Sequence, residues 1–169
     1  MTFLKIIVSA LVLSICYGIL HDLVTAHFCV EYFTIGHPKV IKSESPVLLA
    51  FTWGIIATWW VGLPIGILIA VCNQFGRYPP LDYTLILRMI LKLLLWMFGI
   101  AIIAGVVGYT LTELSVIKLS KNLALLIDKS LHSAFLADGW SHVSSYISGI
   151  IGTIVLCIRI ILLRRTLTT

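Results

Sequence analysis

Four long runs of apolar residues constrain this chain of 169 residues more than any other feature of its sequence. They extend over residues 3–20, 47–72, 83–109 and 143–163. A helix needs about 20 mostly apolar residues to cross the ~30 Å hydrocarbon core of a bilayer. Backbone groups in lipid must bond within their own segment, which favours helices. The sequence therefore predicts an all-α, polytopic membrane protein, built as a four-transmembrane-helix bundle.

The composition agrees with this fold class. Only 11% of the residues are charged and 60% are hydrophobic, and the mean hydropathy is +1.08. A soluble domain normally carries roughly 25% charged residues, because its surface faces water. We therefore expect residues 1–169 to form a single membrane domain that has membrane lipid as its solvent. Basic residues interleaved with aromatic ones would indicate nucleic-acid binding, and the chain has no such patch, so nucleic acid is not expected as a partner.

Charged residues differ between the two sides of the predicted bundle. One side carries seven basic residues and one acidic residue, namely Lys5, Arg77, Arg88, Lys92, Arg159, Arg164, Arg165 and Asp82. The other carries five basic and six acidic residues, namely Lys39, Lys42, Lys118, Lys121, Lys129, Asp22, Glu31, Glu44, Glu113, Asp128 and Asp138. The more basic side is expected to be cytoplasmic. Both termini then lie in the cytoplasm, and residues 21–46 and 110–142 form two exoplasmic segments.

The first apolar run has the general form of a signal peptide, since Lys5 near its start is followed by an uninterrupted apolar stretch. No small-x-small cleavage site follows, and Ile15 before Cys16 does not fit a lipoprotein signal. We expect the run to stay as a membrane helix. The four cysteines, Cys16, Cys29, Cys72 and Cys157, show no paired spacing, so no disulfide framework is expected.

Small residues four apart let membrane helices approach closely. Three such pairs predict helix-packing positions: Gly62 with Gly66, Ala104 with Gly108, and Ser148 with Gly152. Trp59 and Trp60 fall near the middle of their span, far from the headgroups that tryptophan prefers. We expect both rings to pack inside the bundle or to line a cavity.

Both exoplasmic segments have helical patterns. The first helix has no breaker before Gly36, so it is expected to project to about Phe33, with His27 and Glu31 on one face. In the second segment, apolar residues recur at three- and four-residue spacing: Val116, Leu119, Leu123, Ile127, Leu131 and Phe135. This pattern predicts an exoplasmic amphipathic helix between the third and fourth spans. That helix carries Asp128 and His132 four apart, and Asp138 and His142 repeat the spacing beyond a potential break at Gly139.

Histidine and carboxylate side chains gather in these segments and suggest a site at the outer membrane face. The candidate polar cluster is His21, Asp22, Thr25, His27, Glu31 and Tyr32. The candidate ligands for a divalent metal ion are His21, His27, Glu31 and His132, with His142 as a further candidate. In the alternative interpretation, these polar helix ends simply meet water and headgroups. No HExxH, GxSxG, P-loop or dinucleotide motif assigns catalytic residues or a reaction.

One part of the sequence resembles a known family. Three parts of the first half of the chain are together similar to a signature of uncharacterised bacterial multi-pass membrane proteins. They are Tyr17-Gly18-Ile19-Leu20-His21-Asp22, then Thr25 with Glu31-Tyr32-Phe33-Thr34, and finally Ala57-Thr58-Trp59-Trp60-Val61-Gly62. The resemblance covers roughly the first 40% of the chain. It implies a bacterial inner membrane and gives no reaction. It marks His21, Asp22, Thr25, Glu31 and Tyr32 as motif positions, whereas His27 and the second exoplasmic segment lie outside the motif.

Two functions of different class remain open at this point. The first is an accessory, structural or assembly subunit that binds a partner membrane protein or a second copy of itself. The second is a membrane enzyme or metal-handling protein with a His/Asp/Glu site at the periplasmic face. An accessory protein should tolerate changes at His21, Asp22 and Glu31 but fail when Gly62 or Gly66 is enlarged, and an enzyme should show the reverse.

Overall fold

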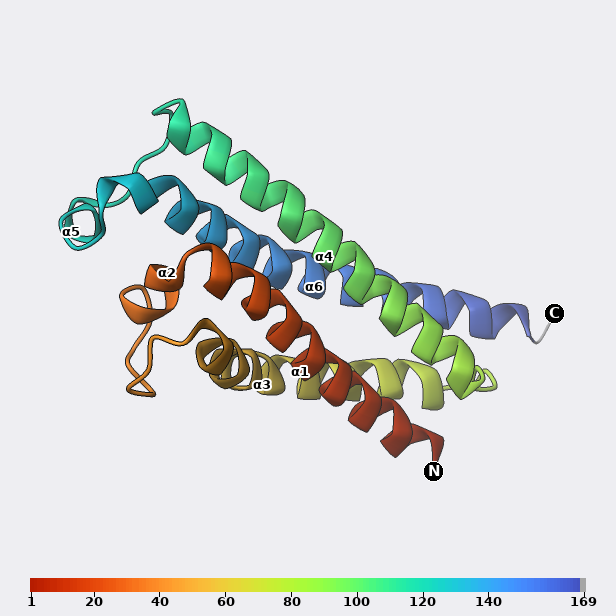
Figure 1. Cartoon of the computed structure of the whole chain (residues 1–169). Helices are drawn as coiled ribbons and strands as arrows, with labels where there is room; N and C mark the ends of the chain where they lie inside the picture. Colours follow the sequence, from red (N-terminus) through yellow and green to blue (C-terminus); the bar gives the residue numbers. More distant parts are fainter. Residues whose placement is uncertain (168–169) are drawn as a thin grey trace.

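The computed structural model describes residues 1–167 as a bundle of four long helices, and these residues contain no β-strand (Figure 1). The elements are α1 (Thr2–Phe28), α2 (Val30–Thr34), α3 (Pro46–Gln74), α4 (Tyr83–Glu113), α5 (Lys121–Ala124), the 3-10 turn η1 (Lys129–Leu131) and α6 (His132–Thr166). Helices α1, α3, α4 and α6 are each long and apolar enough to cross a membrane. The predicted four-helix membrane fold is confirmed.

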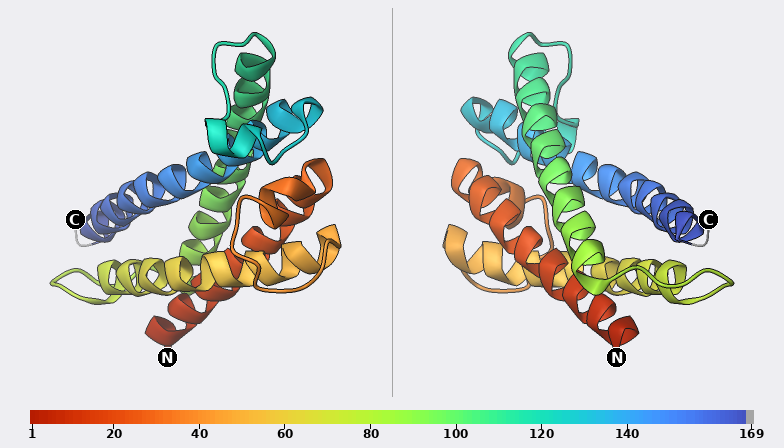
Figure 2. Two further views of the ribbon diagram at one scale, coloured as in Figure 1. Left: turned by 90° about the vertical axis from the view of Figure 1, so that its left-hand side faces the viewer. Right: turned by 90° about the vertical axis from the view of Figure 1, so that its right-hand side faces the viewer.

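The four long helices form two pairs. Helix α1 packs mainly against α3, and α4 packs mainly against α6. Both described termini and residues 75–82 lie at one end of the bundle, which we call the terminus end (Figure 1). Residues 29–45 and 114–131 lie at the opposite end, the loop end, and Figure 2 shows the bundle from each of these ends. The two pairs meet where α3 contacts α6 and where α1 contacts α4 and, over a shorter stretch, α6.

Glycines set the distance between α1 and α3. A Cβ atom on Gly54 would lie 2.5 Å from the backbone nitrogen of Ile19, so only glycine fits there. Gly62 and Gly66 also lie on this interface, where Gly62 faces Ser14. The backbones therefore approach closely along this side of α3, as small residues allow in membrane helices.

Small residues also lie between α4 and α6. Gly108 packs against the indole of Trp140. Gly105 packs against Ser141, whose hydroxyl donates to the Ala101 carbonyl at 3.0 Å. Further toward the terminus end, Gly152 packs against a flexible leucine of α4, and the remaining predicted packing residues, Ala104 and Ser148, are half-buried.

At the terminus end, Arg164 ties α6 to the end of α3. Its side chain is buried, with 2% exposure. The guanidinium donates to four backbone carbonyls, those of Cys72, Phe75, Tyr78 and Pro79. Carbonyls at a helix C-terminus lack partners within the helix, so one arginine here satisfies groups that would otherwise stay unpaired.

The long helices extend further at the loop end than the apolar runs predict. Helix α1 continues to Phe28 and α6 already begins at His132. The polar residues at these ends continue the helices, and even Gly139 leaves α6 unbroken because an interior glycine costs only about 1 kcal/mol. His21, Asp22 and His142 therefore lie on long helices rather than in loops.

The predicted projection of the first helix to Phe33 is wrong. The chain turns at Cys29, whose backbone is extended (φ −149°, ψ 93°), and α2 begins after it. This turn carries Phe33 back into a buried cluster with Ala26 and Leu49. Burial of a large aromatic side chain thus outweighs continued helix, although no glycine or proline marks the position.

The predicted amphipathic helix between the third and fourth spans is not confirmed. Residues 114–131 form only the short elements α5 and η1. The Asp128 carboxylate accepts from the Ser130 backbone N–H at 2.8 Å, and such local bonds compete with a continuous helix. Most of the periodic apolar residues nevertheless share one cluster, in which Leu119, Leu123, Ile127 and Leu131 pack around Cys29 and Phe135, whereas Val116 is exposed.

The expectation for Trp59 and Trp60 is also wrong. Their side chains are 49% and 56% exposed and face away from the bundle. Gly54, Thr58 and Gly62 recur every four residues and contact α1, so they occupy the inner face of α3. The neighbouring tryptophans consequently point away from α1 and out of the bundle.

Candidate metal centre

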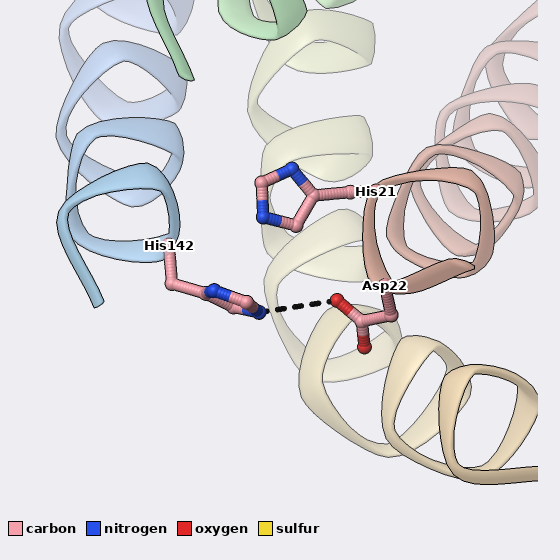
Figure 3. A group of neighbouring side chains, drawn as sticks. All are labelled: His21, Asp22 and His142. Atoms are coloured by element: carbon pink, nitrogen blue, oxygen red, sulfur yellow. Dashed lines mark hydrogen bonds and ion pairs between the residues drawn. The ribbon is translucent and has the colours of Figure 1, made fainter. Parts of the chain in front are cut away.

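Three side chains from two helices meet near the loop end of the bundle (Figure 3). His21 and Asp22 extend from α1 toward α6, which contributes His142. The Nε2 of His142 lies 3.2 Å from Oδ1 of Asp22. One potential ligand atom of each residue lies within 4.8 Å of those of the other two, and residues 1–167 hold no other such group of three.

The antiparallel course of α1 and α6 aligns these residues. One turn nearer the terminus end, the Tyr17 hydroxyl lies 2.7 Å from the Ser145 hydroxyl. Moving four or five residues forward along α1 leads to His21 and Asp22, and moving three residues back along α6 leads to His142. The two helices therefore make successive polar contacts, and the contact with Asp22 is the one nearer the loops.

The group is almost closed to solvent. His21 and Asp22 are 5% and 4% exposed, and the His142 side chain is 12% exposed. The two imidazole rings meet edge to face, with centroids 4.5 Å apart. Helix α2 covers the group from the loop end, because the Tyr32 ring lies 4.6 Å from the His142 ring and Phe33 lies 5.7 Å from it.

The hydrogen bonds of His142 indicate that a cation belongs between its Nε2 atom and the Asp22 carboxylate. The Nδ1 of His142 lies 2.8 Å from the Asp138 carbonyl, which only accepts, so Nδ1 must carry a hydrogen. In a neutral ring, Nε2 then presents a lone pair to the Asp22 carboxylate. Two facing lone pairs need a proton or a metal ion between them. An imidazole that donates to a carbonyl through its other nitrogen is the usual arrangement of a metal-bound histidine.

His21 adds a second unsatisfied donor atom. Its Nε2 is buried and has no hydrogen-bond partner. Buried polar atoms are almost always paired, so this nitrogen, beside a carboxylate and a second imidazole, is free to bind a ligand from outside the chain. Two imidazoles and one carboxylate are a common set for zinc and for non-haem iron(II).

Two reactive groups near the metal-ligand candidates stay neutral, Tyr32 of α2 and Cys29 directly before it. Burial, reinforced by the charge of Asp138, raises the pKa of Tyr32 well above its usual range. Burial also raises the pKa of the Cys29 thiol to about 12. Metals bind the thiolate, so a thiol that stays protonated at neutral pH is a poor ligand. Tyr32 remains a phenol beside His142, and Cys29 remains a packed thiol.

Two spaces adjoin the group. A narrow, mostly apolar cavity of about 80 Å³ lies between the four long helices and is lined by His21, Asp22 and His142. A water molecule needs roughly 10–15 Å³ of such space, so several waters fit. A larger groove of about 490 Å³ runs beside α1, α4 and α6 and is lined by His21, Thr25 and Asp138. The Asp138 Oδ2 atom is buried there without a partner. His21 thus borders both spaces.

Two further residues of the predicted polar cluster lie beside this group. Thr25 is buried one turn from His21 and donates to its carbonyl at 3.2 Å. The Tyr32 ring lies beside the His142 ring, tilted by 31° to it. The structure therefore brings together four of the six predicted cluster residues, His21, Asp22, Thr25 and Tyr32.

Three predicted metal ligands lie outside the group. His27 is exposed and its Nδ1 contacts the Leu23 carbonyl at 2.7 Å. Glu31 accepts from the Cys29 thiol at 3.6 Å, because the turn at Cys29 removes it from the face of α1 that carries His27. The Nε2 of His132 lies 3.1 Å from the Ile127 carbonyl.

His142 is the residue that the predicted ligand set named only as a further candidate. Its only sequence signal is the four-residue spacing from Asp138, which holds because α6 is continuous there.

Comparison of the chain with protein-family models, with curated proteins and with solved structures finds no match.

Proposed function

We propose that this protein binds one divalent transition-metal ion through His21, Asp22 and His142, and that it acts in the membrane as a metal-dependent enzyme or metal-handling protein. The observation that carries the proposal is the contact between His142 Nε2 and Asp22 Oδ1 at 3.2 Å. A buried carboxylate facing an imidazole lone pair, next to the unpaired Nε2 of His21, favours a cation at their centre.

The ligand number supports a reactive rather than a purely structural ion. Structural zinc sites normally have four protein ligands, whereas catalytic sites have three and leave a position for water or substrate. His21, Asp22 and His142 supply three. The adjoining cavity has room for the water that would complete the coordination. An ion held in this way would lower the pKa of its bound water or polarise a substrate oxygen.

The proposal includes a location. The basic excess at the terminus end supports a cytoplasmic position for both termini, which places the ion near the periplasmic face of a bacterial inner membrane. The resemblance to uncharacterised bacterial membrane proteins supports the same location, and its motif includes His21 and Asp22.

Metal analysis of the detergent-purified protein tests the proposal. We expect about one zinc or iron ion per chain in the wild type, after metal loading and removal of loosely bound ions. His21→Gln, Asp22→Asn and His142→Gln should each lower the retained metal at least tenfold, since loss of one of three ligands removes a large part of the affinity. The matched control is the double variant His27→Gln/His132→Gln, which removes two histidines outside the group and should retain the metal.

Two results would contradict the proposal. One is a wild-type chain that holds no zinc, iron, copper or manganese after loading. The other is equal metal retention in the wild type and the three ligand variants. In either case the accessory or assembly role would become the better proposal, and the next step would be a search for a co-purifying membrane protein or a second copy of the chain.

A further inference from the structure

A second feature lies in the other half of the bundle, between α4 and α6. A groove of about 740 Å³ runs between these helices on the outside of the bundle. Three cations line it, Arg88 and Lys92 of α4 and Arg159 of α6. The remaining walls are mostly apolar, with Trp96, Met97, Ile100, Ile147, Ile151 and Val155 among them.

The three cations lie within the helices, away from their ends. Arg88 and Lys92 are four apart on α4, so they share a face. They lie five and nine residues after Tyr83, or about 8 Å and 14 Å into the helix. Arg159 lies seven residues before Thr166, about 10 Å into α6 from the same end. All three therefore line the groove within about 14 Å of the terminus end of their helices.

No acidic side chain among residues 1–167 balances these charges. The acidic residue of the terminus end, Asp82, caps α4 by accepting from the Thr84 backbone N–H at 2.8 Å. No acidic residue lines the groove. Within residues 1–167, the one contact between a basic and an acidic side chain is that of His142 with Asp22, and it involves none of the three cations. Cations in the membrane are costly unless an anion or water reaches them.

The apolar part of the groove has the dimensions of a lipid chain. Its lining extends along α4 from Leu85 to Ile100, which is about 22 Å of helix. One leaflet of the hydrocarbon core is about 15 Å thick. A molecule lying in the groove with its charged group beside the three cations would keep its chain within that leaflet.

We propose that the groove binds an anionic phospholipid, whose phosphate lies among Arg88, Lys92 and Arg159 and whose acyl chain packs along Trp96 and Ile151. Paired arginines and a lysine recognise phosphate through charge and several N–H donors. The apolar walls distinguish a lipid from a free phosphate ion. This inference does not depend on the metal centre, which lies at the opposite end of the bundle.

Native mass spectrometry of the protein released from nanodiscs tests this inference. The nanodiscs would contain equal amounts of phosphatidylglycerol and phosphatidylcholine. We expect phosphatidylglycerol to be retained on the wild-type chain at least fivefold over phosphatidylcholine. The triple variant Arg88→Gln/Lys92→Gln/Arg159→Gln should lose this preference. The matched control, Lys5→Gln/Arg77→Gln/Arg165→Gln, removes three cations of the same end that do not line the groove, and it should keep the preference.

A second variant tests the apolar wall while leaving every charge in place. Val155→Trp adds bulk one turn from Arg159 on the exposed side of α6, where it does not disturb the core. We expect it to reduce retained phosphatidylglycerol at least twofold. Added inorganic phosphate should not displace the lipid.

Three results would overturn the inference. They are equal retention of the two lipids by the wild type, equal loss in the groove and control variants, and complete displacement by inorganic phosphate. The first would mean that the groove does not select charge, and the second that the overall charge of the terminus end attracts the lipid. The third would mean that the groove binds a free anion.

Discussion

The Nε2 of His142 lies 3.2 Å from the Asp22 carboxylate and so joins the α1–α3 pair to the α4–α6 pair across 120 residues of sequence. Both side chains are largely removed from solvent. The contact therefore affects the stability of the bundle as well as the chemistry of the site.

His142→Ala should lower the free energy of unfolding by about 3–5 kcal/mol, because it leaves the buried Asp22 carboxylate without the group that shares a proton or a metal ion with it. Asp22→Asn/His142→Ala should recover part of this loss. Denaturant unfolding in detergent would measure both variants and Asp22→Asn as a double-mutant cycle. His132→Ala serves as the control, since its ring contacts only a local carbonyl. Additive effects of the two substitutions would show that the pair does not interact.

Gly54→Ala should destabilise the protein by about 1–3 kcal/mol, because the added methyl group meets backbone atoms of Ile19 and Gly18 that have no room to move. The control is Gly99→Ala. A Cβ at Gly99 meets nothing within 4 Å, so that substitution should be neutral or stabilise α4 by up to about 1 kcal/mol. Thermal unfolding in one detergent compares the two. Equal effects would rule out a close α1–α3 contact at Gly54.

Arg164→Met should lower the free energy of unfolding by about 3 kcal/mol or more, since four carbonyls lose a charged donor. Arg164→Lys should fall between the wild type and Arg164→Met, because an ammonium cannot reproduce the planar fork. Arg165→Met, at the exposed neighbour, should cost less than about 1 kcal/mol. Chemical unfolding curves measured side by side would check the order, and similar losses at both arginines would contradict it.

Cys29 should react slowly with maleimide while the protein is folded. Its pKa of about 12, against 9.0 for a free thiol, leaves about 1,000-fold less thiolate at pH 8. Because the pKa is raised, the labelling rate should increase as the pH rises toward 12. The test uses a chain with Cys16, Cys72 and Cys157 replaced by alanine, labelled folded and in denaturing detergent. Equal rates at pH 8 in the two conditions would mean that Cys29 is exposed.

Hydropathy predicts the four spans because each helix that crosses lipid must by itself supply about 20 mostly apolar residues. It says little about which face of a span points inward. Trp59 and Trp60 show the difference: their identity suggests an inner position, but the close approach of α1 to Gly54 and Gly62 leaves them outside.

The site was predictable only in part, because sequence patterns are local whereas the packing of helices is not. His21 and Asp22 are adjacent in sequence, so they could be recognised as one polar pair. His142 reaches them only through the packing of α6 on α1, which no local pattern encodes. Conversely, His27 and Glu31 have helical spacing, but the turn at Cys29 separates them, since burial of Phe33 determines the course of the chain there.

The division into two helix pairs has a consequence for biosynthesis. Residues 1–74 form one helical hairpin and residues 83–166 form the next, and each can assemble from contacts between its own neighbouring helices. The first hairpin leaves the ribosome with His21 and Asp22 already in place, but His142 arrives only with the second. A complete set of three donors therefore exists only after the two hairpins dock. An ion held by all three would mark a finished molecule and would hold its two halves together.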